Sequence, residues 1–150
     1  LSTLHTNSAA ESISRLIDMG IEPFLLSPSL VGVIAQRLVR RICRDCGTLS
    51  PPTEYEQELF MRYGLSVTEV MRGKGCPSCN NTGYRGRLAI HEVLVVTEKV
   101  RKQILQESGS IGIRDIAQKQ GDQTLLEDGL AKVAEGLTTI EEVLRVATSD

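Results

Sequence analysis

The sequence predicts a mixed α/β protein with a cysteine-rich metal-binding segment in its middle and short helices in its last third. Three observations lead to this fold class. Several segments place apolar residues at helical spacing behind capping residues. The run from Arg87 to Val96 is apolar and rich in β-branched residues, as expected of a strand. The four cysteines form two C-x-x-C pairs, Cys43 with Cys46 and Cys76 with Cys79.

The composition is that of an ordinary globular protein. In 150 residues, 41% are hydrophobic, 24% are charged and the formal net charge is −2, so a dedicated nucleic-acid binder is not favoured. Aromatic residues make up only 3%, which predicts a core of Leu, Ile and Val. No apolar run approaches the roughly 18 residues of a membrane span. Because residue 1 is Leu and residues 1–5 resemble the end of a strand, we expect a piece of a longer protein.

The first half of the chain predicts helices around the cysteine pairs. Ser8 opens an S-x-x-E capping box and predicts a helix at about 9–19. Ser29 is expected to cap a second helix through Leu30 to Ile34. The segment 37–42 fits either a strand or the tail of that helix. Thr53 opens another capping box, for a helix ending near Gly64.

The second half predicts a turn, a strand and then helices. Residues 72–83 are rich in Gly, Asn, Pro and Cys and predict a tight turn region before the strand at 87–96. From Thr97 onward, apolar residues recur at helical spacing, and Gly121 and Gly136 are plausible helix ends. The box Thr138–Glu141 is expected to cap the last helix.

The two cysteine pairs predict a closed structural zinc site made of Cys43, Cys46, Cys76 and Cys79. Zn²⁺ prefers four soft ligands in a tetrahedron, and each C-x-x-C turn supplies two thiolates. The pairs are separated by residues 47–75, a longer gap than the usual 15–20 or so, and the helix after Thr53 accounts for the excess. Two disulfides or a redox pair are the alternatives, but the first needs an oxidising compartment and the second leaves one pair unused.

The arginines near the cysteines have three open roles. They can offset the charge of about −2 on a zinc tetrathiolate, form a solvated basic face, or contact a nucleotide or a neighbouring subunit. The arginines are Arg40, Arg41, Arg44, Arg85 and Arg87.

Phosphate chemistry has one candidate, His5, which lies ahead of a capped helix whose N-terminus can attract phosphate. A lone histidine is more often structural, and His91 is expected to be packed or on the surface. No phosphate-binding loop of the form G-x-x-x-x-G-K-[ST] occurs in the sequence. The chain therefore contains no complete active site.

Several segments together resemble one family, the ATPases of type II secretion and type IV pilus assembly. Residues 1–7 (LSTLHTN) resemble the histidine box of these proteins. The other matching segments follow in the same order along nearly the whole chain: 15–24 (RLIDMGIEPF), 36–41 (QRLVRR), the four cysteines, and 83–87 (GYRGR). One departure is Leu88-Ala89, where many members have Thr-Gly.

This resemblance implies the C-terminal part of a RecA-like P-loop ATPase that forms hexamers in the bacterial cytoplasm, docked on an inner-membrane platform. Residues 1–42 would end the RecA-like domain, 43–82 would be a tetracysteine zinc-binding subdomain, and 83–150 a return strand with a helical C-terminal subdomain. The Walker A and B elements that bind ATP and Mg²⁺ would lie upstream, so the fragment alone would be inactive.

The same resemblance gives two sets of residues a role in the ATPase. His5 would be catalytic, near the nucleotide phosphates, and Arg40 and Arg41 are candidate nucleotide contacts. Whether the machine secretes proteins or assembles pili does not follow from these residues. The competing hypothesis is a stand-alone zinc-ribbon module that binds nucleic acid or protein through its arginines, and it predicts a basic excess that the sequence lacks.

Overall fold

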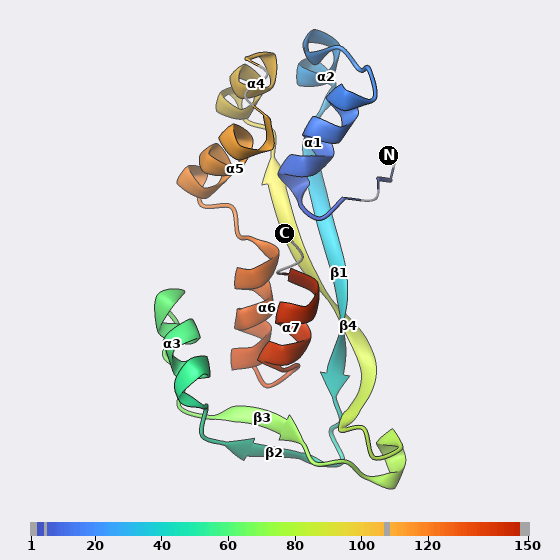
Figure 1. Cartoon of the computed structure of the whole chain (residues 1–150), viewed down its shortest axis with the longest axis vertical. Helices are drawn as coiled ribbons and strands as arrows, with labels where there is room; N and C mark the ends of the chain where they lie inside the picture. Colours follow the sequence, from blue (N-terminus) through green and yellow to red (C-terminus); the bar gives the residue numbers. More distant parts are fainter. Residues whose placement is uncertain (1–2, 5, 107–108, 148–150) are drawn as a thin grey trace. The chain divides into compact units, whose positions relative to one another are not determined.

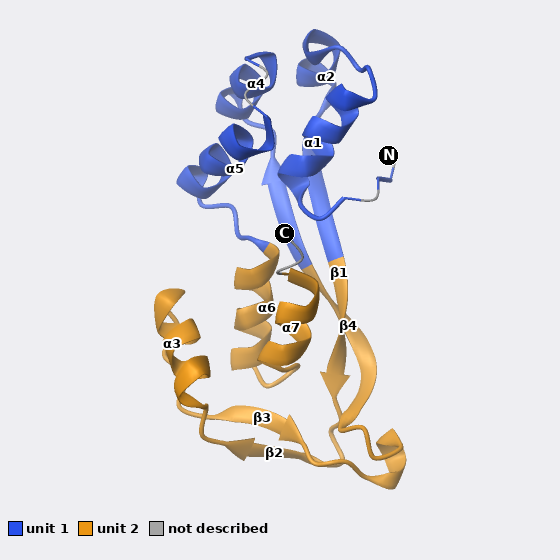
Figure 2. Cartoon of the chain, viewed as in Figure 1, with its two compact units in different colours: residues 1–36, 91–124 blue, residues 37–90, 125–150 orange. Residues whose placement is uncertain are grey.

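The computed structural model describes residues 3–4, 6–106 and 109–147, and the chain forms two compact units (Figures 1 and 2). Residues 1–36 and 91–124 form unit 1, and residues 37–90 and 125–150 form unit 2. Strands β1 (Gly32–Ile42) and β4 (Tyr84–Val95) pair with each other, and each contributes residues to both units. The fold is thus mixed α/β, while the division into 1–42, 43–82 and 83–150 stays a prediction.

Unit 1 is a set of short helices around an aliphatic core. It contains α1 (Ala9–Asp18), α2 (Pro23–Ser29), α4 (Glu98–Leu105) and α5 (Gly109–Gln120). Helix α1 begins as predicted, because the Ser8 side chain accepts a hydrogen bond from the Glu11 backbone N–H. Burial of aliphatic side chains holds the helices together at roughly 1.5–3 kcal/mol each, with Ile13, Leu94, Val100, Ile104 and Ile113 all at 1% exposure or less.

The second helix differs from the prediction. It ends at Ser29 instead of beginning there, and the Ser29 hydroxyl donates to the Leu25 carbonyl inside the helix. Residues 32–42 form strand β1, which also decides the open question about 37–42 in favour of a strand. The β-branched residues Val31, Val33 and Ile34 tolerate both structures, and pairing with β4 selects the strand.

Unit 2 combines three helices with a two-stranded ladder. Its elements are β2 (Gly47–Ser50), α3 (Glu54–Arg62), β3 (Val70–Gly73), the 3₁₀ turn η1 (Pro77–Cys79), α6 (Leu125–Ala134) and α7 (Ile140–Ala147). Strands β2 and β3 pair antiparallel, with Gly47 opposite Gly73 and Ser50 opposite Val70. Sequence analysis assigned neither strand.

The core of unit 2 joins α3 to the pair α6–α7. Phe60 is the only aromatic side chain among the buried described residues, which confirms the expected aliphatic core. Helices α6 and α7 approach closely at Gly129, where an added Cβ would lie 2.4 Å from a methyl carbon of Val143. The cluster comprises Leu59, Phe60, Val70, Leu130, Val133, Ile140 and Val143.

Helix ends in unit 2 test two predicted capping boxes. The box at Thr53 is confirmed, with both reciprocal hydrogen bonds to Glu56 formed. The box predicted at Thr138 is shifted by one residue, because Thr139 caps α7 by accepting from the Glu142 N–H. The Thr138 hydroxyl donates instead to the Arg40 carbonyl at 2.8 Å. Either of the two adjacent threonines could cap the helix. The hydrogen bond from Thr138 to β1 leaves Thr139 as the cap.

The predicted strand at 87–96 and two predicted helix ends are confirmed with small changes. Strand β4 begins at Tyr84, three residues earlier than predicted. Gly121 and Gly136 follow helices with φ of +88° and +74°, as helix-ending glycines do. Within residues 3–4, 6–106 and 109–147, none of the helices combines the length and apolarity that a membrane crossing takes.

Candidate metal centre

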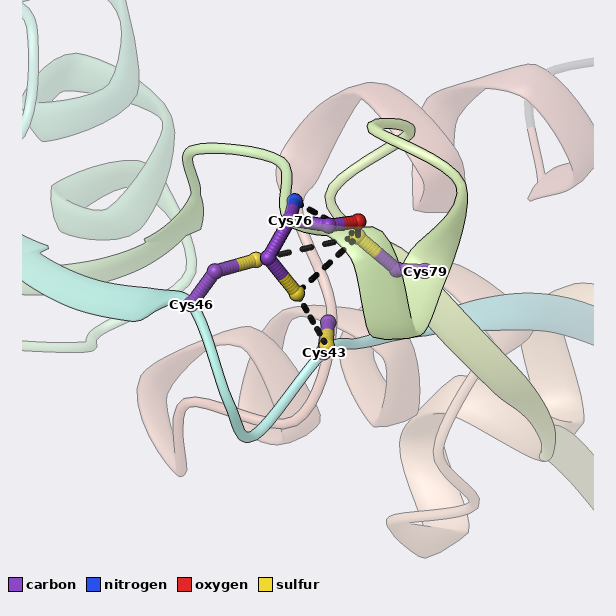
Figure 3. Close-up of side chains that lie close together, drawn as sticks. All are labelled: Cys43, Cys46, Cys76 and Cys79. Carbon is purple, nitrogen blue, oxygen red and sulfur yellow. Dashed lines mark hydrogen bonds between the residues drawn. The ribbon is translucent and has the colours of Figure 1, made fainter.

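The four cysteines converge from two chain segments. Cys43 and Cys46 lie in the turn from β1 to β2, while Cys76 precedes the 3₁₀ turn η1 after β3 and Cys79 is its last residue (Figure 3). Backbone hydrogen bonds hold the segments together, from Cys43 N–H to the Gly83 carbonyl at 2.9 Å and from Lys74 N–H to the Cys46 carbonyl at 3.1 Å. The β2–β3 ladder therefore brings the second pair back against the first.

The sulfur positions fit a tetrahedral metal site. The Sγ–Sγ distances are 3.8 Å for Cys43–Cys76, 3.8 Å for Cys46–Cys79 and 3.7 Å for Cys76–Cys79, and all four sulfurs lie within 4.8 Å of one another. Zn–S bonds of about 2.3 Å give a regular tetrahedron with edges of about 3.8 Å. Three of the distances match that edge. Cys43 and Cys79 are buried, so the site is closed to bulk solvent on that side.

The alternatives to a metal site fit this geometry less well. A disulfide requires an S–S distance of about 2.05 Å, and all four cysteines are free thiols. A redox pair uses two cysteines, whereas here each pair lies against the other. The donor set of four sulfurs is the one that structural zinc prefers.

Backbone N–H donors favour the ionised form of one thiol, that of Cys79. Burial by itself raises the pKa of Cys79, but the N–H groups of Cys76 and Gly83 lie 3.2 and 3.3 Å from its Sγ and lower the pKa to about 6. Burial raises the pKa of Cys46 to about 12, and the neighbouring thiols add to that rise. These N–H groups therefore favour the thiolate form of Cys79, which is the form of cysteine that binds a metal ion.

Glycines allow the two segments to approach this closely. A Cβ on Gly73 would lie 2.0 Å from the Gly83 carbonyl oxygen, and one on Gly83 would lie 2.6 Å from the Gly73 carbonyl oxygen. Gly75 and Gly83 also have φ of +91° and +79°, a region that glycine adopts without strain. The loops around the cysteines thus depend on residues without side chains.

Arg40 is held in a network within unit 2. Its Nε and Nη2 donate to Glu142 Oε1 at 3.0 and 2.7 Å, and its backbone N–H donates to Glu142 Oε2 at 2.9 Å. Its guanidinium also lies 4.2 Å from the ring centroid of Tyr84, a cation–π distance. Arg145 supplies a second cation to Glu142 at 2.9 Å. This network ties the end of β1, three residues before Cys43, to helix α7.

Glu142 is the residue of this network that sequence analysis missed. Its side chain is 1% exposed although it carries a charge. Burial by itself raises the pKa of Glu142, but the hydrogen bonds from Arg40 and Arg145 outweigh it and lower the pKa to about 2. The only local signal is an acidic residue in the first turn of a helix, and its partner Arg40 is remote in the sequence.

The other predicted residues are distributed as follows. Arg41, Arg44, Arg85 and Arg87 line one recess at the junction of β1 and β4. His91 lies half-buried in β4. His5, the predicted catalytic histidine, lies outside the described residues.

The fold and the site define the class of protein: a mixed α/β protein whose four cysteines form a closed site on the segments that follow β1 and β3. Residues 1–145 match the family described as "Type II/IV secretion system protein", and the chain belongs to this family. The resemblance inferred from the sequence motifs is thereby confirmed.

Named relatives come from both branches of the family. The type IV pilus assembly ATPase PilB of Thermus thermophilus is 47% identical over 149 residues, covering 96% of this chain and 16% of that protein. The type II secretion system protein E of Aeromonas hydrophila is 49% identical, covering all of this chain and 30% of that protein. The putative type II secretion system protein E of Escherichia coli is 45% identical, with 99% and 30% covered. The chain therefore spans less than a third of the length of these relatives.

Proposed function

We propose that the chain is the C-terminal part of a hexameric ATPase that powers type II protein secretion or type IV pilus assembly. The observation that carries this proposal is the family match over residues 1–145, with relatives named for both machines. In this proposal the longer protein is cytoplasmic, binds ATP and Mg²⁺, and contacts platform proteins of the inner membrane. No nucleic-acid partner is expected.

The site residues of this proposal have two tasks. Cys43, Cys46, Cys76 and Cys79 hold one structural Zn²⁺ per chain, supported by the sulfur spacing and the closed donor set. His5 acts near the nucleotide phosphates. Of the two arginines assigned to the nucleotide, Arg41 is the better candidate, because the guanidinium of Arg40 is already bound to Glu142.

Exposed apolar residues in unit 1 support the proposal that the chain is part of a larger domain. Val31 is 83% exposed and Ile34 is 66% exposed, and Val93 and Val95 on the paired strand are also exposed. A two-stranded sheet is marginal by itself and normally extends or packs against further elements. Its apolar residues are therefore expected to be covered in the longer protein.

The chain of 150 residues is expected not to hydrolyse ATP. Its sequence lacks the phosphate-binding loop that supplies N–H donors and a lysine to the β- and γ-phosphates. Phosphate release should stay at the level of a mock purification, while the longer protein serves as the positive control. ATP hydrolysis that co-elutes with the chain in gel filtration would contradict the proposal that the ATP-binding elements lie outside these 150 residues.

In the longer protein, His5→Ala is expected to lower the ATPase rate on the order of 100-fold without changing thermal stability. The loss of one group that stabilises transferring phosphate affects rate more than folding. The matched control is His91→Ala, which changes the chain's only other histidine and should keep the wild-type rate. Equal rates for His5→Ala and wild type would make His5 structural.

A further inference from the structure

Four arginines line one open recess in unit 2. The recess has a volume of about 330 Å³ and is lined by Arg41, Ile42, Arg44, Asp45, Arg85, Gly86 and Arg87. The first four residues come from the end of β1 and the turn after it, and the last three from β4. Its volume lies at the lower end of ligand pockets, which span about 300–1,000 Å³.

Most of the positive charge in this recess is not compensated by acidic residues of its lining. Asp45 is the single acidic residue of the lining and pairs only with Arg85, at a long 3.5 Å between exposed side chains. The guanidinium groups of Arg41, Arg44 and Arg87 have no hydrogen bond or ion pair in the part of the chain that the structure describes. Four cations and one anion leave a formal charge of +3 on a chain whose total is −2.

Balancing the cysteine cluster does not account for these arginines. Among the described residues, the hydrogen bonds to Sγ atoms come from backbone N–H groups and other cysteines, not from guanidinium groups. The lining of this recess contains no cysteine; Cys43 lines a neighbouring recess of about 170 Å³, which shares Arg41, Ile42 and Arg44 with the first, whereas Arg85 and Arg87 line the first alone. Adding the full charge of about −2 of a zinc tetrathiolate to the +3 of the recess still leaves about +1.

We propose that this recess binds a phosphate-bearing anion through Arg41, Arg44 and Arg87. Guanidinium groups bind phosphate oxygens bidentately, and several around one recess can share the three oxygens of a phosphoryl group. Gly86 has φ of +83° and a Cβ there would meet no heavy atom within 4 Å, so the backbone between Arg85 and Arg87 is open to a ligand. This site shares Arg41 with the nucleotide contact of the proposed function, and its test therefore uses Arg44 and Arg87, to which the proposed function gives no role.

The test is a titration of the zinc-loaded 150-residue chain with pyrophosphate, followed by amide NMR shifts at low salt. Saturable shifts are expected at the amides of Asp45 and Gly86. Arg44→Gln and Arg87→Gln should each weaken binding about tenfold or more, and the double variant should abolish saturation. Arg62→Gln removes the same charge from α3, outside the recess, and should bind as wild type does.

Four results would overturn the proposal. Absence of saturation, or equal weakening by Arg62→Gln, would reduce the effect to general charge attraction. Citrate binding as tightly as pyrophosphate would exclude phosphate selectivity. Loss of zinc from Arg44→Gln or Arg87→Gln, measured by metal analysis, would assign the arginines to the cysteine cluster.

Two further arms distinguish the sources of phosphate. If ATP binds the chain as tightly as pyrophosphate does, and the chain does not bind vesicles, the ligand is a free phosphate compound. Co-sedimentation with vesicles of phosphatidylglycerol but not phosphatidylcholine, lost in the double variant, indicates a lipid headgroup. Vesicle binding without any pyrophosphate binding would contradict a recess that recognises phosphate.

Discussion

Cys46→Ser is expected to abolish stoichiometric zinc binding and to loosen the chain between residues 43 and 79. In the proposed site four thiolates would hold the ion, and in small zinc-finger peptides such binding contributes apparent free energies on the order of 10–16 kcal/mol to folding. Leu59, Phe60 and Val70 anchor part of the segment in the core of unit 2, but the cysteine loops themselves consist of short strands and turns. Metal analysis should fall from about one zinc per chain toward zero.

Hydrogen exchange locates the effect of Cys46→Ser. Protection should be lost at the amides of Cys43, Lys74 and Cys79, whose bonds close the cysteine loops. The helices after residue 97, which have their own apolar contacts, should keep their protection. Ser78→Ala, an exposed change in the other cysteine turn, between Cys76 and Cys79, is the matched control and should keep its zinc. Wild-type protein that carries no zinc while this segment stays ordered would refute the metal site.

Glu142→Gln is expected to lower the free energy of unfolding by about 3 kcal/mol at pH 7, because it removes a buried charge that Arg40 and Arg145 both need. The pKa of Glu142 is lowered from 4.5 to about 2 in the folded chain. Because the pKa of Glu142 is lower in the folded chain, its carboxylate stabilises the folded state fully at pH values above about 4.5. The advantage of wild type over the variant should therefore shrink as the pH falls from about 4.5 to about 2.

Urea unfolding of both proteins across this pH range measures that difference. Loss of the proposed zinc in acid is expected in both proteins and should therefore cancel in the comparison. Glu141→Gln removes the same charge from the exposed neighbouring residue and should change stability by less than about 0.5 kcal/mol. A wild-type advantage that stays constant down to pH 2 would show that the carboxylate charge of Glu142 does not stabilise the fold.

The parts of the fold that were predictable from sequence are the local ones. Ser8 and Thr53 mark helix starts because their caps need only residues three positions away. The cysteine cluster was predictable because two C-x-x-C turns have few geometric uses other than a common metal.

The parts that escaped prediction depend on contacts between remote segments. Strand β1 replaces a predicted helix because β4 pairs with it. The last cap moved from Thr138 to Thr139 because the Arg40 carbonyl holds Thr138. Glu142 was not predicted, because the local sequence of a buried glutamate does not differ from that of an exposed acidic residue near a helix start. Only the position of Arg40 in the folded chain distinguishes it.

The attachment of β1 to α7 has a consequence for the order in which the chain assembles during synthesis. The end of β1 depends on Leu137, Thr138 and Glu142 for its hydrogen bonds, while both cysteine pairs are complete once Cys79 has been made. A ribosome adds about 5–20 residues per second, so the cysteines wait several seconds for α7. A metal captured in that interval would hold the two loops in register before the helix arrives. The ion would then hold this segment during translation as well as in the finished protein, and α7 would pack against a structure that already exists.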